Sequence, residues 1–64
     1  MNDAERLAAY DGFATDVRSE LDRVGVHMDD LRSQDKAKTA TYRQLFAARM
    51  TLKDIDRRLA ERGL

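Results

Sequence analysis

Apolar residues in the first half of the chain recur at alternating steps of three and four. These residues are Leu7, Tyr10, Ala14, Val17, Leu21, Val24, Met28 and Leu31. Such heptads give a helix one narrow apolar seam, as in coiled coils and antiparallel bundles. The spacing predicts a helix over about 3–33, capped by Asn2 or Asp3. Gly12 and Gly25 disfavour a continuous helix, and a break near Gly25, giving three helices in all, stays open as an alternative.

A polar stretch at about 34–40 interrupts this rhythm and predicts a turn. A second helix is expected over about 41–62, with Thr39 or Thr41 as its cap and Gly63 at its end. Its seam residues are Leu45, Ala48, Leu52, Ile55 and Leu59. We expect this seam, chiefly its larger residues, to pack on the seam of the first helix, from Leu7 and Tyr10 at one end to Leu31 at the other.

The second helix carries another apolar stripe, made of Tyr42, Phe46 and Met50 at steps of four. At about 100° per residue, this stripe lies more than about 90° from the seam. One hairpin partner can cover only one of the two sides. We therefore interpret Tyr42, Phe46 and Met50 as the candidate interface with another chain.

The small size of the chain points in the same direction. A chain of 64 residues with no Cys buries little core and has no disulfide or thiolate metal site to compensate. Oligomerisation is the remaining way to gain stability, and we expect a homodimer. The sequence has no apolar run of membrane-spanning length and no cationic start typical of a signal peptide. A cytoplasmic location with no membrane partner is the expectation.

The formal net charge of zero conceals two halves of opposite sign. Residues 1–35 hold nine acids and four bases, whereas residues 36–64 hold three acids and eight bases. Arg49, Lys53 and Arg57 form a like-charged row that predicts an acidic counterpart. The acids of the first helix, within the chain or in a second copy, are the favoured counterpart. The alternative is RNA, bound by Arg43 together with this row.

Side chains for catalysis or metal binding are few. Nucleophilic catalysis needs Ser or Cys beside a base, and the chain offers only Ser19, Ser33 and His27. His27 and Asp30 share one side of the predicted helix, but two ligands do not make a metal site. Residues 50–59 resemble the first helix of a helix-turn-helix, but only residues 60–64 follow, too few for a recognition helix, so that motif is not expected either. We predict no enzyme activity, no catalytic residues, no cofactor, no metal and no DNA partner.

The segment Lys36-Ala37-Lys38-Thr39-Ala40-Thr41-Tyr42-Arg43-Gln44-Leu45, with the helix that follows, resembles the turn and second helix of short bacterial α-helical hairpin proteins of unknown function. The resemblance covers less than half of the chain and implies a hairpin without implying an activity. In length and expected architecture the chain is also similar to the Rop family of plasmid RNA-binding hairpins, whose two copies form a four-helix bundle. No residue motif carries that similarity, so it concerns architecture alone.

Together these observations predict an all-α fold: one domain over residues 1–64, folded as an antiparallel helical hairpin that pairs into a four-helix bundle as a homodimer. The expected function is that of a non-enzymatic protein-protein interaction or regulatory module. An RNA-binding dimer that uses the basic second helix is the alternative. The biological role, the partner's identity and the orientation of the helices in the assembly do not follow from the sequence.

Overall fold

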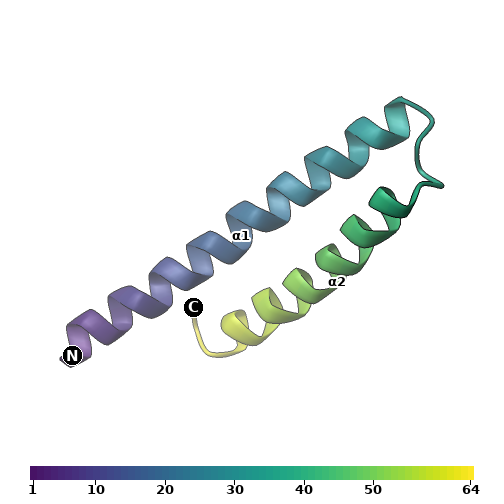
Figure 1. The fold of residues 1–64 in the computed structure, drawn as a ribbon. Helices are drawn as coiled ribbons and strands as arrows, with labels where there is room; N and C mark the ends of the chain where they lie inside the picture. The colour runs from purple at the N-terminus through teal and green to yellow at the C-terminus, as the bar shows by residue number, and fades with distance from the viewer.

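The computed structural model describes all residues, 1–64, and contains two helices joined by a short turn (Figure 1). Helix α1 (Asp3–Ser33) begins at Asn2, whose side-chain oxygen accepts a hydrogen bond from the Glu5 backbone N–H at 2.8 Å. This bond satisfies one of the N–H groups that a helix start leaves without a partner. The helix runs unbroken through Gly12 and Gly25, so the three-helix alternative is wrong.

The turn after α1 is set by backbone hydrogen bonds around Asp35. This residue has a positive φ of 58°. Its N–H donates to the Arg32 carbonyl at 3.0 Å, and the Lys36 N–H donates to the Leu31 carbonyl at 2.8 Å. This pair of bonds is the Schellman motif, which ends a helix and redirects the chain. Asp tolerates the left-handed conformation better than most residues, so the turn needs no glycine here.

Helix α2 (Ala40–Glu61) starts at Thr39, whose hydroxyl accepts a hydrogen bond from the Tyr42 N–H at 3.2 Å. The helix ends at Glu61, and Gly63 just beyond it takes a φ of 82°. There the N–H groups of Gly63 and Leu64 donate to the carbonyls of Ala60 and Leu59, both at 3.0 Å. This is a second Schellman motif, and Leu64 packs against the core as the accompanying apolar contact.

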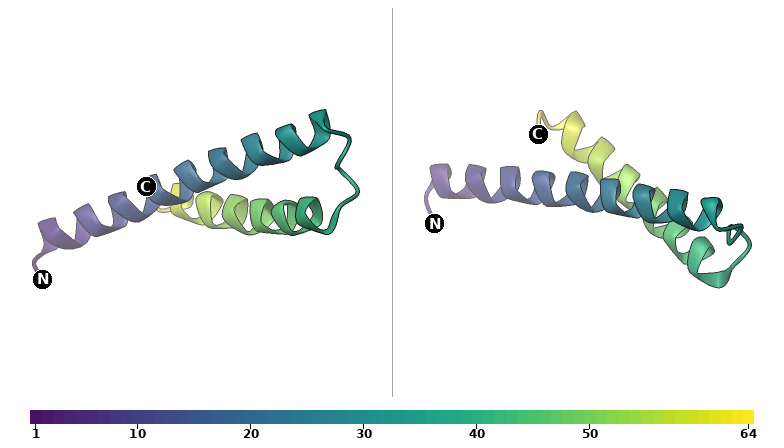
Figure 2. Two further views of the ribbon diagram at one scale, coloured as in Figure 1. Left: turned by 45° about the horizontal axis from the view of Figure 1, so that its top comes forward. Right: turned by 90° about the horizontal axis from the view of Figure 1, so that it is seen from above.

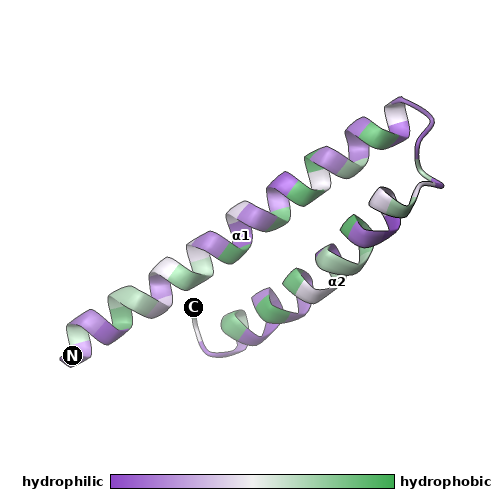
Figure 3. Ribbon diagram, in the orientation of Figure 1, coloured by the Kyte–Doolittle hydropathy of each residue, from purple (hydrophilic) through white to green (hydrophobic).

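The two helices run antiparallel and pack against each other, which confirms the predicted all-α hairpin (Figures 1 and 2). Seen from above, α2 crosses α1 at an angle, as the right view of Figure 2 shows. Only four residues are buried, and all four are apolar: Ala14, Val17, Met28 and Leu59. In the hydropathy colouring of Figure 3, apolar residues occur along the facing sides of the helices and polar residues fill the turn. The core is therefore a single thin layer of apolar side chains between α1 and α2.

The structure corrects three positions of the predicted seam. Leu7 and Tyr10 are 56% and 53% exposed, because α2 is shorter than α1 and ends before it reaches them. Ala48 is also exposed, whereas its neighbour Arg49 is half-buried. The two helices cross at an angle, so an ideal antiparallel seam does not describe every position of α2 (Figure 2). The long apolar stem of Arg49 allows that side chain to be partly covered.

The hydropathy of the two helices also bears on membranes. Neither α1 nor α2 combines the length and apolar character that crossing a bilayer requires.

Candidate interaction surface

The predicted interface residues of α2 differ in how much of each is covered. Tyr42 is half-buried, whereas Phe46 and Met50 are 53% and 52% exposed. The Thr39 cap fixes where α2 begins, and the steps of four then keep all three side chains on one side of the helix. We call Phe46 and Met50 the outer patch. Large apolar side chains that remain half exposed on a folded chain mark a surface that association can cover.

The outer patch is surrounded by positive charge. Between Ala40 and Lys53 the helix contains three bases, Arg43, Arg49 and Lys53, and no acid. None of these three side chains takes part in an ion pair. Phe46 and Met50 therefore lie on a basic surface whose charge is not compensated within the chain.

Arg57, the last residue of the predicted basic row, differs from the others. Its guanidinium donates to Asp54 Oδ1 and to Glu61 Oε1, both at 2.6 Å, and Arg58 Nε donates to the second Asp54 oxygen at 3.0 Å. The hydrogen bond from Arg57 holds the pKa of Asp54 below its usual range, and the same bond raises the pKa of Arg57. The charge of Arg57 is thus neutralised locally, so it is less suited than Arg43, Arg49 or Lys53 to bind an acidic partner.

One ion pair joins the two helices, and its charges are the reverse of the expected ones: the base lies on α1 and the acid on α2. Arg18 Nε of α1 donates to Asp56 Oδ1 of α2 at 2.7 Å, and Arg18 Nη1 donates to the main-chain oxygen of Leu64 at 2.9 Å. The remaining ion pairs lie within one helix, among them the contact of Arg32 with Asp29. No pair joins an α1 acid to an α2 base, so within one chain the acids of the first helix are not the ion-pair partners of the basic row. Mostly apolar seams face each other, and the bases lie to the side of the contact.

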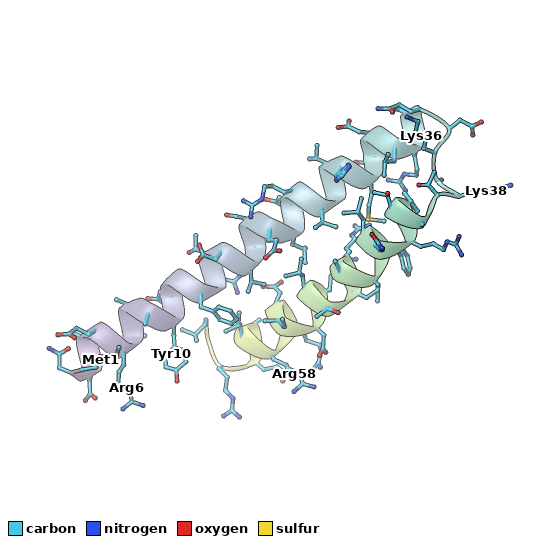
Figure 4. The ribbon with its side chains drawn as sticks, in the orientation of Figure 1. Met1, Arg6, Tyr10, Lys36, Lys38 and Arg58 are labelled. Carbon is cyan, nitrogen blue, oxygen red and sulfur yellow. The ribbon has the colours of Figure 1, made fainter.

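A second exposed apolar surface lies on α1, and the sequence reasoning missed it. Residues 3–13 extend past the end of α2, and we call this segment the overhang (Figures 1 and 4). Its seam side carries Leu7, Tyr10 and Phe13, which are 56%, 53% and 50% exposed. The unequal lengths of the two predicted helices were the signal that could have revealed it: a helix of 22 residues cannot cover one of 31.

A notch forms where the overhang meets the end of α2. An open hollow of about 390 Å³ is lined there by three apolar residues, Phe13, Ile55 and Leu59, and by three charged ones, Arg58, Glu61 and Arg62. Its apolar lining extends the exposed apolar surface of the overhang toward the end of α2. Phe13 belongs to both features.

The surface around His27 has no comparable organisation. His27 and Asp30 are exposed and border a shallow hollow of about 320 Å³ together with Asp22, Arg23 and Val26. No three His, Asp or Glu side chains converge closely enough to hold a metal ion. The arrangement offers charge and one imidazole at an open surface, without the buried surroundings that tune a catalytic group.

Comparisons of the chain with protein-family models, with curated proteins and with solved structures found no match.

Proposed function

We propose that this chain is a non-enzymatic protein-protein interaction module that acts as a homodimer, in which two hairpins pair into a four-helix bundle. The observation that supports it most is the placement of the large apolar side chains. Seven of them are at least half exposed, against four buried residues in the whole chain. A single hairpin therefore buries only three large side chains, Val17, Met28 and Leu59, and leaves seven at least half in water, which pairing would cover.

The experiment is sedimentation equilibrium over a range of chain concentrations, combined with circular dichroism, on the wild type and on Phe46→Glu. We expect a helical dimer in the wild type and a much weaker dimer in Phe46→Glu, because a carboxylate would have to be buried in the interface. The matched control is Ala48→Glu, which adds the same charge to an exposed position about 160° around the same helix. A folded wild-type monomer at micromolar concentration would contradict the proposal.

A second candidate function is RNA binding by such a dimer. It is favoured by the absence of ion-pair partners for Arg43, Arg49 and Lys53, and by the aromatic rings of Tyr42 and Phe46 beside them. Aromatic rings among bases stack on unpaired nucleotides while the cations neutralise phosphates. Titration with single-stranded RNA at rising salt tests it: an affinity that falls steeply with salt supports RNA binding, and no binding at low salt eliminates it.

A further inference from the structure

We infer that the overhang of one copy docks on the outer patch of a second copy, so that an antiparallel two-fold pair covers both exposed apolar surfaces at once. This inference rests on the proposed homodimer and specifies its register. Five of the seven half-exposed large apolar side chains belong to these two surfaces: Leu7, Tyr10, Phe13, Phe46 and Met50.

Charge selects this pairing over the two like-with-like alternatives. The overhang carries Asp3, Glu5 and Asp11 against Arg6, a net charge of −2, whereas residues 40–53 carry three bases and no acid. Overhang against overhang would bring acids together, and outer patch against outer patch would bring uncompensated bases together. Overhang against outer patch joins opposite charges, which also provides the acidic counterpart that the hairpin itself does not supply.

The register of the hairpin gives the position of the outer patch along the molecule. The bond between Arg18 and Asp56 places these two residues at the same level. Met50 and Phe46 precede Asp56 by six and ten residues. At 1.5 Å per helical residue they lie about 9 and about 15 Å from that level, on the side of the turn.

The overhang lies at a similar distance from the level of Arg18, but on the side away from the turn. Arg18 is the middle residue of α1 (Asp3–Ser33), and Tyr10 precedes it by eight residues, or about 12 Å. A two-fold axis perpendicular to α1, passing beside the helix at the level of Arg18, therefore moves Tyr10 of the second copy to about 12 Å on the side of the turn, between the levels of Met50 and Phe46. The symmetric pairing that overlaps the lengths of α1 completely is thus also the one that brings the overhang and the outer patch to the same level.

The size of the molecule fits such a pair. Its principal extents are 49 × 16 × 15 Å, so the outline of a long face encloses at most about 800 Å² in projection. Each partner of a standard protein-protein interface buries about 800 Å². In Figure 4 the labelled Arg6 and Tyr10 lie on the part of α1 that has no α2 beside it, where a second copy has access.

Disulfide cross-linking tests the register, because the chain contains no Cys of its own. Tyr10→Cys and Met50→Cys are prepared as separate chains, mixed at concentrations where the wild type is dimeric, and oxidised. Within one chain these two positions lie about 21 Å apart along the molecule, whereas a disulfide needs Cα atoms closer than about 7 Å. Any link between them therefore joins two copies. The matched control replaces Tyr10→Cys by Ala8→Cys, on the opposite side of the overhang.

The expected result is a covalent heterodimer from the mixture of Tyr10→Cys and Met50→Cys. Each variant alone and the Ala8→Cys mixture should yield at most about a tenth as much. Covalent dimer from Tyr10→Cys alone would mean that the overhangs pair with each other, and would overturn the inference. A dimer in sedimentation that gives no cross-link between the two positions would overturn it too, while the proposed homodimer stands. A folded monomer in sedimentation would instead refute the homodimer itself.

Discussion

The overhang and the covered part of α1 belong to one helix and to one heptad series, yet their exposure is opposite. Leu7 and Tyr10 are 56% and 53% exposed, whereas Ala14 and Val17, the next two residues of the series, are 2% and 4% exposed. What changes between Tyr10 and Ala14 is the neighbour, because α2 ends there. The apolar pattern identifies the side of a helix that is stabilised by burial. Whether that side is buried within one chain depends on the length of the helix that packs against it.

The largest expected difference in the free energy of unfolding is between two leucine replacements, one in the covered part of the hairpin and one in the overhang. Leu59→Ala should lower the free energy of unfolding by about 2–4 kcal/mol, because Leu59 fills the core beside Ala14 and Val17. Leu7→Ala should cost less than about 0.5 kcal/mol where the chain is monomeric, since its side chain is already in water. Urea unfolding followed by circular dichroism measures both. Equal losses for the two variants at every chain concentration would contradict the comparison.

Glycine replacements give the next effect in size. Gly25→Ala should raise the free energy of unfolding by about 0.5–1 kcal/mol, because Gly25 lies inside α1 and a Cβ there meets no atom within 4 Å. Gly12→Ala should make the overhang more helical while it changes global unfolding little, since the overhang can fray on its own. Urea unfolding reports the first effect and amide exchange the second. A destabilised Gly25→Ala would show that the glycine is needed for packing.

Arg18→Gln should loosen the end of α2. The substitution removes the ion pair with Asp56 and the bond to the main chain of Leu64, at a cost of about 0.5–1 kcal/mol because both groups are partly exposed. The loss should shrink in high salt. Arg23→Gln is the matched control, since Arg23 takes part in no ion pair. Thermal unfolding at two salt concentrations measures the effect, and equal shifts for both variants would contradict it.

The smallest effect is a pH dependence from Asp54. Its pKa is lowered in the folded chain by the hydrogen bond from Arg57, so ionised Asp54 adds stability above its unfolded-state pKa and loses it as the pH falls through the folded-state pKa. Asp54→Asn should therefore be slightly less stable than the wild type at neutral pH and equal to it in acid. Asp16→Asn, at a site with no ion pair, is the control. Thermal unfolding across this range measures the difference, and a gap that persists in acid would contradict the assignment.

Much of the fold follows from local patterns in the sequence. The heptad series predicts a helix through Gly25, and polar residues predict the turn. The helices are capped where the sequence predicted, by Asn2 and Thr39 at their starts and with Gly63 after the end of α2. These features depend on neighbouring residues, so a single sequence contains the information. The left-handed Asp35 was not anticipated, because Asp tolerates this conformation without requiring it, and the Schellman bonds decide which residue of the turn adopts it.

The candidate surface was only partly predictable. The steps of four identified Phe46 and Met50, but not that Tyr42 is half covered or that Arg57 is neutralised by Asp54 and Glu61. Those outcomes depend on how the helices cross and which rotamers the long side chains adopt. Heptad spacing fixes neither of these.

Amide hydrogen exchange at several chain concentrations tests most directly the central claim that a second copy covers the overhang. The account predicts that the amides of residues 7–13 exchange almost freely in dilute solution. Their protection should rise about tenfold for a hundredfold increase in chain concentration, as mass action shifts the chain into dimers. Residues 17–28 should remain protected throughout. An overhang that exchanges at the same rate at every concentration would contradict the account, because no second copy would then be covering it.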